Sequence, residues 1–231
     1  MKPKVVRKVA LRQTRVPTGV GDFSNTQYAA LGLRAAHDAG ITLPKEAITK
    51  AIHAIVAAQQ PDDGGSNVPP GRKSRGWCYD NPCKCPLHRP YGTMTAGMVS
   101  SLAIFDYILG RDAKKDAAIL DGLCWLQVHY AVDTVPGPIE WDKISKSTYV
   151  PYYLYGLQRA GILTGNEKLG THFWYADGVR VLLDAQKPDG SWKIDDWGTD
   201  TWDTCFALLF LRRATRPLVP SEDRFIKAND R

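Results

Sequence analysis

Apolar residues recur at helical spacing in seven segments of this chain, and the first six of these segments form three consecutive pairs. Almost no segment alternates apolar and polar residues over more than four positions, as a half-buried strand would. The expected pairs are 25–39 with 45–60, 93–109 with 113–128, and 148–163 with 171–185, followed by an unpaired segment at 201–214. The sequence therefore predicts an all-α fold of about three and a half helical hairpins.

Two sets of residues repeat in phase with these segments. The threonines near the starts of the odd-numbered segments lie 69, 53 and 56 positions apart; they are Thr26, Thr95, Thr148 and Thr204. The glutamines near the ends of the even-numbered segments lie 67 and 59 positions apart; they are Gln60, Gln127 and Gln186. Because two independent markers keep one phase, we expect the hairpins to be copies. The odd segments are rich in small residues and are expected to be inner helices, whereas the even segments are amphipathic and are expected to be outer ones.

The formal charge of +6 is concentrated at the start of the chain. Six basic residues and no acid lie within the first fifteen positions, which leaves 24 basic against 24 acidic residues elsewhere. A balanced body argues against a nucleic-acid-binding face. No apolar run is long enough to span a membrane, and the start lacks the apolar centre of a signal peptide, which favours a cytoplasmic location. We expect a basic tail at 1–18, a repeat domain at 19–214 with a Cys-rich loop at 61–91, and a second tail at 215–231.

A short motif follows the third pair of segments. Gln186, Gly190 and Trp192 stand in the spacing Gln-x-x-x-Gly-x-Trp, which resembles the motif repeated in squalene and terpene cyclases. A second copy, without its Trp, stands at 60–65, and residues 203–209 resemble an inner-helix opening of the same superfamily, which includes the protein prenyltransferases. The resemblance implies an α/α-toroid of helical hairpins. We expect Trp192 to pack across the joint between the third hairpin and the last helix.

The resemblance also implies that the array is an incomplete ring. A closed toroid of this superfamily has about six hairpins, roughly twice as many as this chain supplies. We therefore expect either that the chain is a fragment lacking an N-terminal half or that two chains form a homodimer that completes the ring. In both cases the first and last inner helices should expose apolar surface.

Two acidic residues at the start of the last helix are the candidates for catalysis. The segment 200–204 resembles the Asp-x-Asp-Asp-Thr segment whose middle acid protonates the substrate in squalene-hopene-type cyclases. Asp200 and Asp203 match the flanking acids, but Trp202 stands where the proton donor would be, which argues against cyclase chemistry by that route. The alternative is that Asp203 is a helix cap. Asp203 and Cys205 also resemble the Asp-x-Cys zinc ligands of prenyltransferases, although no His follows them; the alternative for Cys205 is a small buried side chain.

An aromatic stretch on the expected third inner helix is the candidate ligand site. The rings of Tyr149, Tyr152 and Tyr153, together with Trp202 on the last helix, are expected to line a cavity for an isoprenoid-type small molecule. Tyr155 belongs to the same stretch. Helical geometry directs only two or three of the tyrosines inward, and core packing is the alternative use of these rings.

The loop between the first two hairpins carries the candidate metal ligands. Cys78, Cys83, Cys85 and His88 supply three thiolates and one imidazole, the ligand set of a closed structural zinc site. The alternatives are free thiols or a disulfide between Cys78 and Cys83.

Three functions are compatible with these features. The first is a terpene cyclase/prenyltransferase-like domain that handles an apolar isoprenoid-type ligand, with Trp202 arguing against catalysis by the known acid. The second is a non-catalytic helical repeat module for protein binding. The third is a zinc-dependent prenyltransferase-like subunit.

Overall fold

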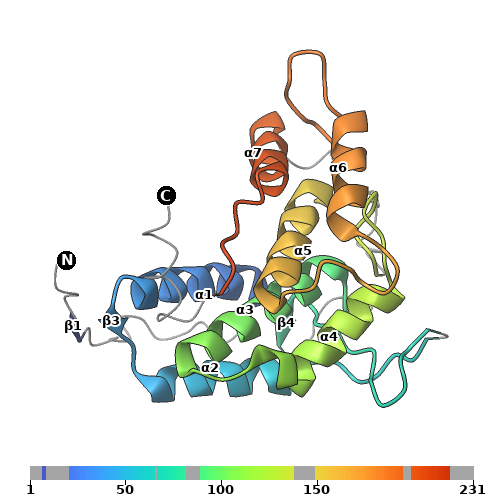
Figure 1. The fold of residues 1–231 in the computed structure, drawn as a ribbon. Helices are drawn as coiled ribbons and strands as arrows, with labels where there is room; N and C mark the ends of the chain where they lie inside the picture. Colours follow the sequence, from blue (N-terminus) through green and yellow to red (C-terminus); the bar gives the residue numbers. More distant parts are fainter. Residues whose placement is uncertain are drawn as a thin grey trace, which may run out of the picture.

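The fold is described by a computed structural model for residues 7–8, 21–65, 67–81, 89–137, 149–194 and 199–218. The described part is mostly helical, as predicted, and its helices lie close to the expected segments (Figure 1). They are α1 (Phe23–Asp38), α2 (Lys45–Ala57), α3 (Gly92–Leu109), α4 (Ala117–Val128), α5 (Val150–Thr164), α6 (Trp174–Asp184) and α7 (Asp200–Leu211), with a short 3-10 helix η1 (Ala113–Lys115) before α4.

The odd-numbered helices form a continuous row. Helix α1 packs against α3, α3 against α5, and α5 against α7, so these four are called the inner helices below. Helices α2 and α4 both pack against α3, and α6 packs against α5. The described hairpins are therefore stacked side by side, with the inner helices in contact from one hairpin to the next.

Burial distinguishes the middle of this row from its ends. Every residue of α3 from Gly92 to Asp106 is buried, since inner and outer helices surround it. This helix is long and apolar enough to cross a bilayer, but 83% of that stretch is buried inside the protein, as in a core helix. On α7 only Asp203, Ala207 and Phe210 are buried, because no described helix covers its other side. The charged helix α2 likewise buries a single stripe, Ile48, Ile52 and Ile55.

The ends of several helices are set by capping residues. Asp22 precedes α1 and accepts bonds from the amides of Ser24 and Asn25, and Asp116 does the same for α4 with Ala118 and Ile119. Ser24 and Asn25, although good cap residues themselves, are thus the donors. Gly110 and Gly165 end α3 and α5 in the left-handed conformation, which Gly adopts without strain.

Two short strand pairs and a returning segment complete the described structure. Strand β1 (Arg7–Lys8) pairs in parallel with β3 (Ile41–Thr42), and β2 (Gly21–Asp22) pairs antiparallel with β4 (Asp80–Asn81). After α7 the chain runs back toward α1, where Arg34 donates to the carbonyls of Arg216 and Pro217 at 2.7 and 2.9 Å. Packing therefore continues past 214, the expected end of the repeat domain, to Leu218, which contacts the core.

Candidate functional site

Trp192 joins the third hairpin to the last helix. Its side chain is 2% exposed, its indole Nε1 donates to the carbonyl of Leu182 in α6 at 2.7 Å, and its backbone N donates to Thr204 Oγ1 in α7 at 3.0 Å. The predicted position of Trp192 across this joint is confirmed. Its role is structural, because both of its donors are taken up by the two helices that it connects.

Trp77 makes the same contacts between the first and second hairpins. Its Nε1 donates to the carbonyl of Ile55 in α2 at 2.8 Å, and its backbone N donates to Thr95 Oγ1 in α3 at 3.1 Å. The sequence motif had shown no Trp for this copy because residues 61–76 separate Gln60 from Trp77. The amide of Gln60 donates across this insertion to the carbonyl of Gly76 at 2.9 Å, just as that of Lys187 donates to the carbonyl of Ser191.

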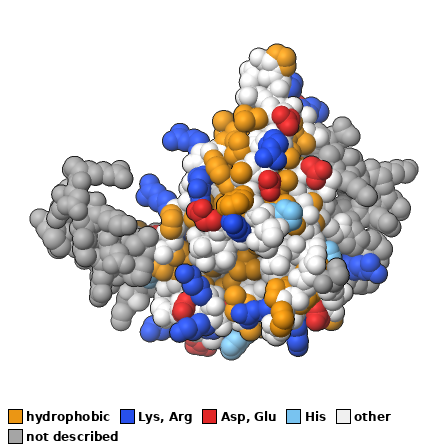
Figure 2. Space-filling view, turned by 45° about the vertical axis from the view of Figure 1, so that its right-hand side comes forward, with side chains coloured by type: hydrophobic (Ala, Val, Ile, Leu, Met, Phe, Trp, Pro, Cys, Tyr) orange, Lys and Arg blue, Asp and Glu red, His pale blue; other side chains and the backbone are white. Residues whose placement is uncertain are grey.

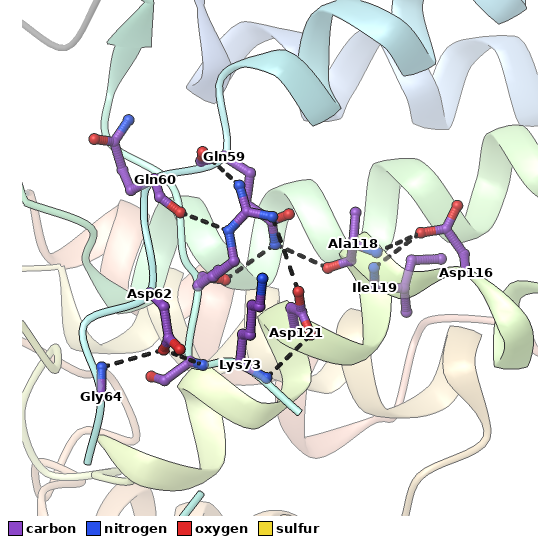
Figure 3. Close-up of polar contacts among 11 residues, drawn as sticks. Gln59, Gln60, Asp62, Gly64, Lys73, Asp116, Ala118, Ile119 and Asp121 are labelled. Carbon is purple, nitrogen blue, oxygen red and sulfur yellow. Dashed lines mark hydrogen bonds and ion pairs between the residues drawn. The ribbon is translucent and has the colours of Figure 1, made fainter. Parts of the chain in front are cut away.

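The inserted residues and the glutamine before them form hydrogen bonds with α4, the outer helix of the second hairpin, as Figure 3 shows. The amide of Lys73 donates to the carboxylate of Asp121, and the side chain of Gln59 donates to the carbonyl of Ala118 at 3.0 Å. Arg75 donates to the carbonyls of both Gln59 and Gln60. All of these groups hold the connection between the hairpins, so this region is a joint rather than a reaction site.

The two candidate catalytic acids are both engaged in contacts with the loop before α7. Asp203 is 4% exposed and accepts a bond from the amide of Ile194 at 2.7 Å. The residue that flanks the start of α7 is Thr199, so the interpretation of Asp203 as the helix cap is wrong. Asp200 lies 2.7 Å from Lys187 Nζ and 3.8 Å from Lys193 Nζ. The bond with Lys187 lowers the pKa of Asp200, which therefore stays ionised at neutral pH and is a poor proton donor.

Of the cysteines that the structure describes, Cys78 is in a disulfide, and Cys124 and Cys205 are free thiols. Cys78 is disulfide-bonded, and the cysteine that it pairs with lies outside the described residues. A cysteine in a disulfide has no thiolate and therefore does not ligate zinc. The other three predicted ligands, Cys83, Cys85 and His88, also lie outside the described residues, so a zinc site in the reduced chain stays a prediction. Cys205 is exposed, which makes its interpretation as a small buried residue wrong.

Aromatic side chains from the inner helices α1, α5 and α7 lie close to one another. The ring of Phe206 on α7 lies 5.1 Å from that of Tyr152 and 6.0 Å from that of Tyr155, both on α5. Tyr28 on α1 is 43% exposed, whereas the other three rings are partly buried. Burial, together with the nearby Tyr28, raises the pKa of Tyr152, so its phenol stays protonated. This group of rings offers π-faces from three different helices.

A buried polar pair lies beneath these rings. Arg159 on α5 is 1% exposed, and its guanidinium lies 4.4 Å from the centroid of the Tyr155 ring and 5.7 Å from that of Tyr28. Its Nη2 donates to the amide oxygen of Gln27, whose Nε2 donates in turn to the phenol oxygen of Tyr152. The inner cluster is defined as these six residues: Gln27, Tyr28, Tyr152, Tyr155, Arg159 and Phe206.

Gly97 of α3 makes room for this pair. A Cβ at position 97 would lie 3.0 Å from the amide oxygen of Gln27, closer than side-chain carbons ordinarily approach. The small residues of the inner helices, read from the sequence as a sign of enclosure, thus allow the amide of Gln27 to approach the backbone of α3.

Only one of the residues predicted to line a cavity belongs to the inner cluster. Tyr152 does, but Tyr153 is fully buried elsewhere and donates to the carbonyl of Ala131 at 3.2 Å. Tyr149 stands at the start of α5 in a left-handed conformation with 38% of its surface exposed, and Trp202 is 58% exposed. Arg159 and Gln27 were missed, since nothing in the local sequence distinguishes them from solvated polar residues.

A scan against protein-family models, a search of curated proteins and a search of solved structures each found no match. The resemblance to the cyclase and prenyltransferase superfamily therefore rests on the sequence motifs and stays a prediction.

Proposed function

We propose that this chain is part of a terpene cyclase/prenyltransferase-like α/α-toroid and that its inner cluster binds an isoprenoid-type ligand. The observation that carries the proposal is the convergence of Tyr28, Tyr152, Tyr155 and Phe206 from three inner helices. Branched, unsaturated hydrocarbon chains pack well against aromatic faces, and each aromatic side chain offers a large apolar area for such packing. The motif around Trp192 supports the same superfamily.

The proposed role is binding rather than cyclisation by protonation. Trp202 stands at the position of the proton-donating acid, and neither flanking acid is suited to replace that acid. Asp203 holds the amide of Ile194, and Asp200 is paired with Lys187. An acid that protonates a hydrocarbon must be held in its protonated form, which a lysine partner disfavours.

Calorimetric titration with farnesol, a neutral fifteen-carbon isoprenoid alcohol, tests the proposal. We expect saturable binding that Phe206→Ala weakens by about tenfold or more, because burying one Phe side chain contributes on the order of 1.5 to 3 kcal/mol. Phe173→Ala is the matched control, since Phe173 is 52% exposed and lies on the outer layer before α6. Absence of saturable binding to the folded protein, or equal effects of the two variants, would contradict the proposal.

A second candidate function is protein binding through the last helix. Trp202, Leu208 and Leu209 are 58%, 48% and 36% exposed on α7, and apolar side chains reach the surface among charged ones on the face shown in Figure 2. A further hairpin or a second copy of the chain would cover such a surface in a complete ring. Sedimentation of the wild type and of Leu208→Lys over a range of concentrations tests this candidate. Association of the wild type alone would support it, and a monomer at all concentrations would contradict it.

A further inference from the structure

Arg159 is a buried, charged residue, and two of its nitrogen donors have no hydrogen-bond acceptor in the described structure. Its side chain reaches from α5 to α1 and is 1% exposed. Of its three nitrogens only Nη2 donates a hydrogen bond, to Gln27, while Nε and Nη1 have no hydrogen-bond partner. No carboxylate of the described residues forms an ion pair with this guanidinium, although other described arginines form such pairs, among them Arg111 with Asp106.

This arrangement is costly for the ligand-free protein. A guanidinium stays charged at all ordinary pH values, so it cannot escape burial by losing its proton. The faces of Tyr155 and Tyr28 stabilise the charge, but ring faces do not accept the in-plane N–H groups of Nε and Nη1 as oxygen atoms would. A buried charge is ordinarily paired, and an exception points to a partner that binds from outside.

The partner that fits two free guanidinium nitrogens is an oxyanion. Carboxylate and phosphate oxygens accept charge-assisted bonds from guanidinium groups, and both are compact enough to follow a hydrocarbon chain between rings. Tyr28, whose ring lies 5.7 Å from the guanidinium, is the most exposed ring of the inner cluster. Two rings of the cluster thus lie against the guanidinium, and the ring of Phe206 lies against those of Tyr152 and Tyr155.

We propose that Arg159 binds the acidic head group, a carboxylate or a phosphate, of the ligand whose hydrocarbon chain packs on the rings of the inner cluster. This inference rests on the function proposed above and adds the charge of the ligand to it. Gln27 is the positioning residue, because its amide oxygen holds Nη2 and leaves the other two nitrogens free.

The test compares three ligands that share one chain and differ in head group: farnesol, farnesoic acid and farnesyl monophosphate, each titrated below the concentration at which it forms micelles. The wild-type protein should bind at least one of the two acids about tenfold or more tightly than the alcohol, since hydrogen bonds to charged groups are among the strong ones. The acid that binds more tightly identifies the head group as a carboxylate or a phosphate.

Two variants test whether Arg159 causes the preference for the acidic ligands. Arg159→Met should abolish the preference for the acids, and it should melt no lower than the wild type, because it removes a buried unpaired charge. Arg213→Met is the matched control, since Arg213 also lies over aromatic rings, 4.9 Å from the centroid of Tyr175, but outside the inner cluster. It should leave the preference unchanged.

The outcomes separate this inference from the proposed function. Equal binding of all three ligands to the wild type would overturn the inference and leave the proposed function standing, and this comparison requires no variant to fold. Failure of all three to bind would overturn both. A marked loss of melting temperature in both Arg159→Met and Arg159→Lys, with farnesol binding lost as well, would show that Arg159 is a structural clamp and would overturn the inference.

Discussion

Single side chains connect the hairpins of this protein, and the tryptophans do so most clearly. Trp192 contributes a large buried ring and two hydrogen bonds, one to the outer helix behind it and one to the inner helix ahead. Trp202, ten residues later, is more than half exposed. The two rings therefore differ in what their removal should cost, although they lie in the same short stretch of sequence.

Replacing Trp192 by Ala should lower the free energy of unfolding by about 3 to 5 kcal/mol, as large aromatic truncations in cores do. Trp202→Ala is the control and should change it by less than about 1 kcal/mol. Urea denaturation followed by circular dichroism measures both. A loss below about 1 kcal/mol for Trp192→Ala would rule out its role in joining α6 to α7.

Asp106 should make the stability of the protein depend on pH. It is 1% exposed near the end of α3, with one carboxylate oxygen 3.1 Å from Arg111 Nε. Burial raises its pKa from 3.8 to about 6, an effect that the charge of Arg111 partly offsets. Between about pH 4 and pH 6 the folded state thus keeps a proton that the unfolded state releases, so this group's contribution to stability falls as the pH rises.

We expect Asp106→Asn to remove this destabilising effect, which is on the order of 3 kcal/mol at pH 7 because the pKa of Asp106 rises by about two units on folding. The difference in the free energy of unfolding between variant and wild type should be small or negative at pH 4 and should shift in favour of the variant toward pH 7. Urea titrations at four pH values across this range measure it. Parallel curves for the two proteins would show that Asp106 ionises at its ordinary pKa in the folded state.

At the scale of helices, the joint before α3 and the joint before α7 are held by the same kinds of contact. Trp77 and Trp192 each donate a backbone N–H to a threonine at the start of the next inner helix, Thr95 and Thr204 respectively. Thr95 is fully buried, whereas Thr204 is partly exposed and water can replace its hydroxyl. The same bond should therefore matter more at the first joint.

Thr95→Val should destabilise the protein by about 1 to 3 kcal/mol, because it leaves the buried amide of Trp77 without an acceptor. Thr204→Val should cost less, and Thr95→Ser, which keeps the oxygen, should cost less than Thr95→Val. Chemical denaturation of the three variants ranks them. If Thr95→Val and Thr95→Ser were equally stable, the hydrogen bond would contribute nothing and the joint would depend on packing alone.

The helices could be predicted from sequence because their signal is local. Apolar spacing within each segment placed all seven within a few residues of the observed bounds. The helix caps are harder to predict from sequence. Asp22 and Ser24 are both good cap residues, and only the backbone conformation decides which of them accepts the hydrogen bond at the start of α1. Trp77 was missed because its insertion is specified by contacts with α4, such as that of Lys73 with Asp121, which sequence spacing does not reveal.

At the scale of the whole molecule, the candidate site depends on contacts between distant parts of the chain. Gln27 and Arg159 are 132 residues apart in sequence and meet only because α1 and α5 both pack on α3. The aromatic stretch on α5 could be noticed from the sequence, but which of its rings face α1 and α7 depends on the rotation of the helix. That is why Tyr155 replaces Tyr153 in the cluster.

The central claim is that an isoprenoid-type ligand binds between the inner helices, and photoaffinity labelling tests it most directly. A farnesyl analogue carrying a diazirine would be cross-linked to the folded protein with and without excess farnesol, and the labelled peptides mapped by mass spectrometry. We predict labelling that farnesol suppresses within α1, α5 and α7, at or beside Tyr28, Tyr155 and Phe206. Suppressible labelling confined to α2, α4 and α6, or labelling that farnesol does not suppress anywhere, would contradict the claim.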